Sequence, residues 1–349
     1  MRKTIYSIQT LRGLAASMVV FFHAQVLIEI YMERYGIQAA VLNSVEPLRI
    51  VGASGVDIFF AISGFIMAYI THQQRGSFKE VMPFLKRRFI RILPLYWFYL
   101  SVFVLLLISV PHLFNRAVFN WHDVIYSYLL VPYTSEANPT APLIGLAWTL
   151  WYELFFYALV ALGLFMREKT FILLIGLLFL FTVFLLPQLA SARFALILML
   201  NNPVLFEFLA GFICGVVFLS ELTLPKWLAS IFFILTLTLY VAWFVDYPQI
   251  PVGFASTSLV AFAIVLEKSC VLRIPSFLIE LGNSSYSIYL SHCLVLPALG
   301  KMLAAAGAVK TFSPDFLIVV LTVCCIILGY ILFVVVEKPL IRCIRRISE

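Results

Sequence analysis

Charged side chains are scarce in this chain, and their scarcity excludes most soluble proteins. Asp, Glu, Lys and Arg make up 12% of the 349 residues, against about 25% in soluble globular domains. Hydrophobic residues make up 63%, more than a water-soluble fold of this size could cover with polar groups. The same composition excludes intrinsic disorder, collagen and a disulfide-rich secreted scaffold. We therefore predict an all-α, polytopic membrane protein.

The chain also lacks internal repeats, low-complexity tracts and metal-ligand spacing of cysteine or histidine. We expect no metal and no permanently bound cofactor. A convincing signal-peptide cleavage site is absent too, although Arg2 and Lys3 precede the first apolar run, so we expect this run to be retained as a span. The cysteines are predicted to be reduced packing residues, namely Cys214, Cys270, Cys293, Cys324, Cys325 and Cys343.

Ten apolar runs are long enough to cross about 30 Å of hydrocarbon as helices. We predict a single membrane domain over residues 1–349 with no appended soluble domain. The longest connection, 111–146, contains an apolar piece, 124–132, that is too short to cross and is interfacial or re-entrant. The predicted spans are 13–32, 55–71, 92–110, 147–165, 171–187, 199–219, 227–245, 252–267, 285–304 and 315–336.

The distribution of basic residues predicts the orientation of these spans, because Lys and Arg are retained on the cytoplasmic side. With a cytoplasmic N-terminus, seventeen Lys and Arg fall in cytoplasmic segments and six in outer ones. Both termini are therefore predicted to be cytoplasmic. Most of the net charge of +7 follows from this topology, so the lipid bilayer is an expected partner and nucleic acid is not.

Two polar residues in the first span are candidates for chemistry. Arg12 and His23 are eleven residues apart, about three helical turns, so they share one helix face with about 16 Å of rise between them. Ionisable groups inside a span are costly and therefore functional candidates. An imidazole can accept and return a proton near neutral pH, which suits a buried general base. The alternative is a packing histidine with a snorkelling arginine.

A basic cluster, Lys86, Arg87, Arg88 and Arg91, stands at the predicted cytoplasmic mouth of the third span. Arg88 and Arg91 are three residues apart and project from the same side of a helix. Two neighbouring guanidinium groups suit phosphate oxygens. The alternative is a positive-inside anchor beside an aromatic belt.

Glu153 lies inside the fourth predicted span, behind Trp148 and Thr149. A carboxylate there must be neutral, paired or exposed to a wet cavity. Pairing with His23 or Arg12 is plausible, and the sequence leaves the partner open. A structural pair that stabilises the bundle is the alternative.

Further polar residues interrupt the second and ninth predicted spans. Asp57 opens the second span, and Ser63 is followed by Gly64, a pair that close helix packing alone can explain. Tyr289 and His292 are three residues apart in the ninth span. Because His23 and His292 are both expected at mid-membrane depth, we predict a polar interior cavity. The residues expected to line a substrate cavity are Asp57, Ser63, Trp148, Tyr289 and His292.

Together these segments resemble the acyltransferase family 3 membrane proteins, particularly those that modify bacterial exopolysaccharides, lipopolysaccharide O-antigens and nodulation factors. The resemblance covers essentially the whole chain. Five segments carry it in the family order: Arg12 with His23, Gly55 to Phe65 (GVDIFFAISGF), Arg88 with Arg91, Trp148 to Glu153 (WTLWYE), and the SYSIYLSH stretch that ends at His292.

The resemblance implies transfer of an acyl group, usually acetyl, from cytoplasmic acyl-coenzyme A to a carbohydrate hydroxyl at the bacterial inner membrane. It implies His23 as the catalytic base with Arg12 as its companion. Arg88 and Arg91 match a pair implicated in acyl-donor handling, and Glu153 matches a family carboxylate. The partners implied are acyl-coenzyme A, a carbohydrate or lipid-linked glycan acceptor, and polysaccharide assembly machinery.

A transporter of an acyl compound or a glycan precursor is the alternative function, because transporters also keep polar residues at mid-membrane depth. The absence of an inverted repeat and the phosphate-suited basic cluster favour the enzyme. A purely structural component of an assembly complex is a third possibility, for which two buried histidines are unnecessary. Aromatic residues in 111–146 are typical of either a sugar-binding platform or an interfacial belt.

Overall fold

The computed structural model describes residues 4–37, 42, 46–72, 74, 78–111, 119–133, 142–189, 195–244, 252–269 and 273–348. Within these ranges every regular element is a helix, which confirms the all-α prediction. Arg2, Lys3 and Cys270 lie outside the described residues. The other five cysteines are free thiols, as predicted.

The apolar helices confirm a polytopic membrane protein. Two of the predicted spans appear as shorter apolar helices, Val204–Leu219 and Trp227–Ala242. Residues 252–267, a short run in the sequence, lie in a helix of spanning length. Within the described ranges, eight helices are long and apolar enough to cross a membrane: Tyr6–Tyr35, Leu48–Thr71, Phe78–Ser109, Gly145–Gly163, Glu168–Gln188, Val252–Ser269, Ser285–Ala305 and Pro314–Arg346.

Several helices begin well before the apolar run that predicted them. Helix α1 spans Tyr6–Tyr35 and helix α5 spans Val81–Ser109, whereas the corresponding runs start at residues 13 and 92. Lys and Arg are good helix formers, so the end of an apolar run does not end a helix. Consequently the basic cluster of residues 86–91 lies on α5 itself.

The chain divides into two compact units. The first comprises Met1–Ile66 and Ala210–Val336, and the second comprises Met67–Leu209 and Glu337–Glu349. Elements of the first unit are α1, α3 (Glu46–Ala53), most of α4 (Gly55–Thr71), most of α11 (Val204–Leu219), α12 (Trp227–Phe244), α13 (Val252–Ser269), α14 (Ser276–Asn283), α15 (Ser285–Ala305), α16 (Ala308–Thr311) and α17 (Pro314–Leu332). Elements of the second are α5, α6 (Trp121–Leu129), α7 (Trp148–Gly163), α8 (Glu168–Leu180), α9 (Leu186–Leu189), α10 (Ala195–Leu200) and α18 (Lys338–Ser348).

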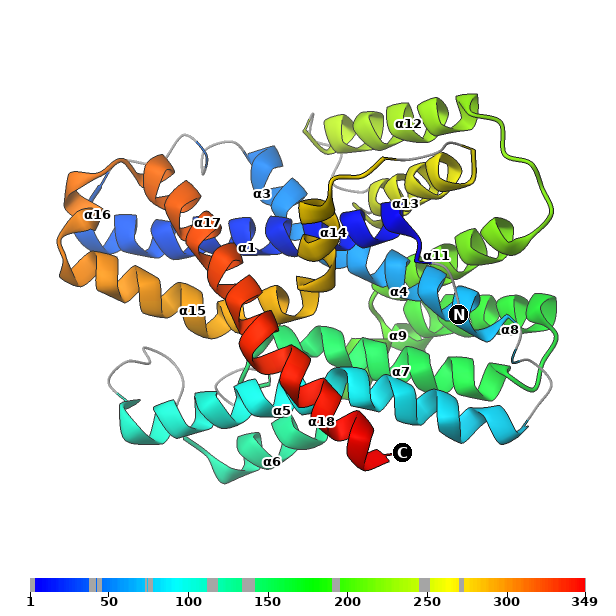
Figure 1. Ribbon diagram of the computed structural model, residues 1–349, viewed down its shortest axis with the longest axis horizontal. Coiled ribbons are helices and arrows are strands. Elements are labelled where there is room, and N and C mark those ends of the chain that lie inside the picture. Colours follow the sequence, from blue (N-terminus) through cyan, green and yellow to red (C-terminus); the bar gives the residue numbers. More distant parts are fainter. Residues whose placement is uncertain are drawn as a thin grey trace. The chain divides into compact units, whose positions relative to one another are not determined.

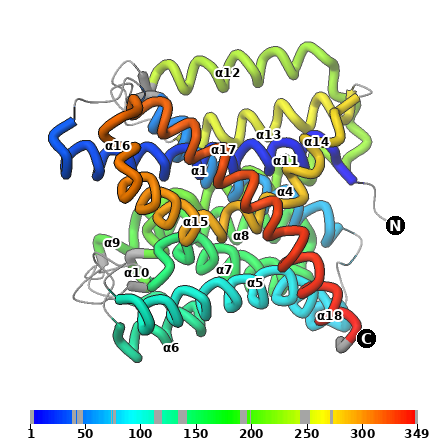
Figure 2. The backbone as a smooth tube through the Cα atoms, turned by 60° about the vertical axis from the view of Figure 1, so that its left-hand side comes forward, coloured from blue at the N-terminus to red at the C-terminus, as the bar shows by residue number. Residues whose placement is uncertain are grey.

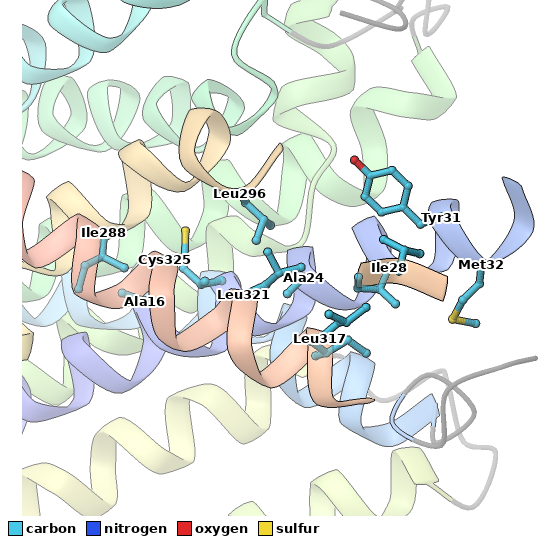
Figure 3. Close-up of a cluster of buried hydrophobic side chains, with 13 residues drawn as sticks. Ala16, Ala24, Ile28, Tyr31, Met32, Ile288, Leu296, Leu317, Leu321 and Cys325 are labelled. Atoms are coloured by element: carbon cyan, nitrogen blue, oxygen red, sulfur yellow. The ribbon is translucent and has the colours of Figure 1, made fainter. Parts of the chain in front are cut away.

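Helix α1 is the central element of the first unit, where it contacts α3, α13, α14, α15 and α17. Figures 1 and 2 show α17 crossing α1 and α15. One face of α1 carries Ala16, Ala24 and Ile28, which are fully buried against Leu296 of α15 and Leu321 of α17 (Figure 3). Alanine on this face lets the neighbouring helices approach closely. The packing thereby fixes the orientation of the α1 face that carries His23.

Glycine allows two helices to meet α1 almost backbone to backbone. A Cβ on Gly282 of α14 would overlap the carbonyl oxygen of Gln9, and a Cβ on Gly55 of α4 would crowd the carbonyl oxygen of Ala15. In α4 itself, residues 63 and 64 do not interrupt the helix, which runs without a break from Gly55 to Thr71. Gly and Ser lower helix propensity by only about 1 kcal/mol or less, which is too little to end the helix here.

Adding a methyl group at Gly282 is expected to destabilise the first unit. Gly282→Ala should lower the free energy of unfolding by about 1–3 kcal/mol, because α14 must move away from α1 to relieve the overlap. Gly145→Ala is the matched control, since a Cβ there meets no atom within 4 Å. Thermal unfolding in detergent would compare the two, and equal melting temperatures would contradict the close approach.

The second unit is organised along α5. This helix contacts α6, α7 and α18, and Figure 1 shows α6 and α7 on different stretches of its length. Aromatic residues fill the interior, where the rings of Phe156 and Phe208 stack with 3.8 Å between centroids and Phe179 packs beside Phe156. Pro94 lies within α5, where it removes one backbone hydrogen bond.

Candidate active site

Two histidines from opposite ends of the chain meet inside the first unit. His23 of α1 and His292 of α15 have ring centroids 4.9 Å apart. His292 is 1% exposed, and His23 is half-buried. The two histidines that stand out in the sequence are therefore in direct contact. Ionisable groups inside an apolar bundle are costly, so the adjacent imidazoles make this place the candidate site.

The hydrogen bonds of these rings fix where their protons lie. The His23 Nδ1 atom is 2.9 Å from the carbonyl oxygen of Val19, and the His292 Nδ1 atom is 3.3 Å from that of Ile288. A carbonyl oxygen only accepts, so Nδ1 carries the proton in each neutral ring and Nε2 carries the lone pair. The His292 Nε2 atom is buried without a hydrogen-bond partner in the described residues. Each ring thus presents an unprotonated nitrogen able to accept a proton.

Tyr289 and Phe59 extend the histidine pair toward α4. The Tyr289 ring packs edge-on against His292, with 5.9 Å between centroids, and Phe59 packs edge-on against Tyr289 at 5.6 Å. Ser63 follows one turn after Phe59 on α4 and is 7% exposed. Asp57 is half-buried in the first turn of the same helix, where the helix dipole favours a carboxylate. Tyr289 contacts His292 of the histidine pair directly, whereas Ser63 and Asp57 lie on the neighbouring helix α4.

Arg12 is held by side chains from the junction of α14 and α15. Its guanidinium group donates to the Gln9 Oε1 atom at 3.2 Å and to the Ser285 Oγ atom at 3.0 Å. The Gln9 amide in turn donates to Asn283 at 2.7 Å. This network joins α1 to the start of α15, the helix that carries His292. These hydrogen bonds join Arg12 to the two helices that carry the histidine pair. They do not include either histidine.

Glu153 and Arg88 interact inside the second unit. The Tyr157 hydroxyl donates to the Glu153 Oε1 atom at 2.5 Å, and Arg88 interacts electrostatically with both residues. Tyr157 is 1% exposed, while Arg88 and Glu153 are half-buried. The Arg88 Nε atom is buried without a hydrogen-bond partner among the described residues. Arg88 is thus the fixed member of the basic cluster, a guanidinium group directed into the unit.

The other members of the basic cluster, Lys86, Arg87 and Arg91, are exposed on α5. Arg87 is 4.0 Å from Glu80, an exposed pair. Trp148 begins α7 and packs edge-on against Tyr152, with 5.8 Å between centroids. The predicted motif residues of this unit therefore lie on helices α5 and α7.

Sequence reasoning missed Tyr157, Ser285 and Gln9. Tyr157 lies four residues after Glu153 on α7, and Gln9 lies three residues before Arg12 on α1, so helical spacing could have predicted both contacts. Nothing in the local sequence indicates that Ser285 meets Arg12, because that contact depends on how α15 packs. Across the ranges that the structure describes, no three His, Cys, Asp or Glu side chains gather to hold a metal ion.

Comparison with known proteins places this constellation in a family. The family model described as an acyltransferase domain, acyltransferase family 3, matches residues 5–334. This chain belongs to acyltransferase family 3. A relative, the exopolysaccharide production protein ExoZ of Rhizobium meliloti strain 1021, is 30% identical over 298 residues, which cover 84% of this chain and 90% of the relative. No solved structure matches the chain.

Membership decides between the functions that the sequence left open. The chain is a multi-pass membrane acyltransferase rather than a transporter. The match spans both the histidine pair and the Arg88, Glu153 and Tyr157 group.

Proposed function

We propose that this protein is an O-acyltransferase of the bacterial inner membrane that acylates an exopolysaccharide or its lipid-linked precursor. Acyl-coenzyme A, with acetyl as the preferred acyl group, is the donor on the cytoplasmic side. Family membership and the relative involved in exopolysaccharide production support the activity and the acceptor class. The observation that carries the proposal is the pair of unprotonated imidazole nitrogens on His23 and His292.

In the proposed reaction the His23 Nε2 atom accepts the proton of an acceptor hydroxyl. The hydroxyl oxygen attacks the thioester carbonyl carbon, and the carbon–sulfur bond of the resulting tetrahedral intermediate breaks. The departing thiolate takes the proton back from His23, so the products are the sugar ester and free coenzyme A. The Val19 carbonyl keeps Nδ1 protonated, which directs Nε2 at the acceptor.

The remaining groups have supporting roles in the proposed reaction. His292 lies against His23, so the imidazolium formed during transfer neighbours a polarisable ring rather than an aliphatic side chain. Arg12 joins α1 to α15 and keeps the two histidines in register. Arg88 and the exposed Lys86, Arg87 and Arg91 present positive charge for the phosphates of the donor. Glu153 and Tyr157 hold Arg88 in place.

A direct assay tests the proposed function. Membranes containing the protein, incubated with labelled acetyl-coenzyme A and host glycan, are expected to produce labelled glycan. Alkaline ester hydrolysis should release the label from this glycan. A host lacking the gene should lose the same ester from its exopolysaccharide, which glycan analysis would show. His72→Ala is a suitable control variant, because His72 is exposed and pairs only weakly with Glu168 at 3.8 Å. Unchanged glycan in the deletion strain would contradict the proposal.

An acyl-His23 intermediate is the rival mechanism. Rapid quenching without acceptor would distinguish the two mechanisms. Protein that carries no acyl group supports direct transfer, whereas acylated His23 would replace the general base by a nucleophile.

A further inference from the structure

Helix α18, in the second unit, carries its arginines on one face. Arg345 and Arg346 lie three and four residues after Arg342, so the three side chains project from the same side of the helix. All three are exposed. Among the described residues, none of these guanidinium groups forms a salt bridge. In the described part of the chain, α18 therefore presents positive charge that no carboxylate compensates.

The apolar side chains of α18 are covered by protein. Leu340, Ile341 and Ile344 are half-buried, and no large hydrophobic side chain is exposed over residues 338–346, the part of α18 whose side chains the structure describes. A helix that inserts into the membrane interface needs an apolar face free to enter the acyl chains. Because the apolar face of α18 is occupied, its exposed arginines are directed toward water.

Helix α18 meets α5 close to the basic cluster of α5. The two helices are in contact. From Ile92 onward α5 is the apolar run of a membrane span, and a helix with several cations is too costly to place beside such a run in hydrocarbon. The contact therefore falls toward the basic start of α5. Figures 1 and 2 agree, because α18 crosses α5 and ends beside the half of α5 nearer its start.

The start of α5 and the whole of α18 together form a strongly positive surface. Neither residues 81–91 nor residues 338–348 contain Asp or Glu. Like charges this close repel one another, and a ligand with several negative charges relieves that repulsion. Guanidinium groups suit phosphate oxygens in particular. The basic residues of the two stretches are Lys86, Arg87, Arg88, Arg91, Lys338, Arg342, Arg345 and Arg346.

We propose that α18 binds the phosphorylated nucleotide end of the acyl donor, with Arg342, Arg345 and Arg346 contacting its phosphate groups beside the exposed cations of α5. This inference rests on the proposed function, in which acyl-coenzyme A is the donor. The 3′-phosphate and 5′-diphosphate of coenzyme A lie at the opposite end of the molecule from the thioester. The inward-directed Arg88 provides a single guanidinium group, too few donors for these phosphates, and α18 supplies the others.

Two donors that differ in their phosphates test the proposal. In Arg342→Gln/Arg345→Gln the KM for acetyl-coenzyme A should rise about tenfold or more with kcat within about twofold, because only ground-state binding is lost. The kcat/KM for acetyl-pantetheine, which has no phosphate, should stay unchanged. Lys226→Gln/Arg273→Gln removes two other exposed cations and is the matched control. An unchanged KM for acetyl-coenzyme A, or an equal loss with both donors, would overturn the proposal.

Cys343 provides a direct measurement of binding, because it is an exposed free thiol on α18. In protein whose other cysteines are replaced by serine, adenosine 3′,5′-bisphosphate should slow the alkylation of Cys343 by a maleimide at least severalfold. The same nucleotide should not protect Cys343 in Arg342→Gln/Arg345→Gln. Equal alkylation rates with and without nucleotide in the protein that retains both arginines would overturn the proposal.

The alkylation assay also separates donor phosphate from lipid phosphate. Without nucleotide, nanodiscs of phosphatidylcholine alone and nanodiscs that include phosphatidylglycerol should give equal alkylation rates. Protection by phosphatidylglycerol but not by the nucleotide would assign the surface to anionic lipid and overturn the proposal. Alkylation requires no acyl transfer, so a failure of this assay is distinguishable from a failure of the proposed function.

Discussion

Replacing His23 by alanine is expected to lower the rate of acyl transfer by about two to four orders of magnitude, the usual contribution of a positioned general base. His23→Gln should be equally inactive. A glutamine amide can still donate to the Val19 carbonyl where the His23 Nδ1 atom does, but it cannot accept a proton. The measurement is kcat for acetyl transfer from acetyl-coenzyme A in purified, reconstituted protein.

The two His23 variants separate catalysis from packing. Gln preserves the size and the hydrogen bond of the side chain, so thermal stability should stay near that of the native protein while activity is lost. His72→Ala, at an exposed position of the second unit, should keep full activity. If His23→Gln retained activity within a few-fold of the native enzyme, the ring would be a packing residue and the proposed base would be wrong.

Substitutions in the Arg88 and Glu153 pair should have very different effects on stability and on activity. Arg88→Met removes a positive charge that interacts with the Glu153 carboxylate, which still accepts from the Tyr157 hydroxyl. Glu153→Gln removes a negative charge that interacts with Arg88. Each substitution should destabilise the protein, and the double variant should recover most of the loss, because removing both charges of a partly buried pair is less costly than removing one. A double-mutant cycle should give a coupling free energy of about 1–3 kcal/mol.

Activity should not recover with stability. Arg88 is proposed to bind donor phosphate, so the KM for acyl-coenzyme A should rise at least tenfold in Arg88→Met and stay raised in the double variant. The exposed pair of Arg87 and Glu80 provides the control cycle, where the coupling should lie within about 1 kcal/mol. Recovery of both stability and KM in the double variant would show that the pair is purely structural.

The helical class of the protein followed from its composition and from its long apolar runs, because a helix that crosses hydrocarbon must be apolar over about 20 residues. Ten runs predicted ten spans, and the described residues contain eight helices of spanning length and two shorter apolar helices. Helix ends were less predictable. The start of α5 at Val81 lies before a basic cluster that interrupts hydropathy without interrupting the helix.

The candidate site was likewise predictable only in part. Arg12, His23, Arg88 and Glu153 stand out in the sequence because polar groups in apolar runs are costly. The partners of these residues could be predicted from the sequence only where they lie within a few residues on the same helix, as Tyr157 does after Glu153. The sequence left His23 and Arg12 open as partners of Glu153, and the structure instead records Tyr157 and Arg88.

The sequence by itself determined that this protein is an all-α membrane protein, which side chains are too polar for their surroundings, and which family its motifs resemble. The hydrocarbon core requires each span to be apolar, so these features can be predicted from each apolar run by itself. Only the tertiary structure decided that His23 meets His292, that Arg12 reaches Ser285, and that α6 ends against Tyr96 and Trp97. The contacts between α1 and α15 join helices distant in the chain, and α1 packs closely against its neighbours at Gly55 and Gly282, which no single apolar run encodes.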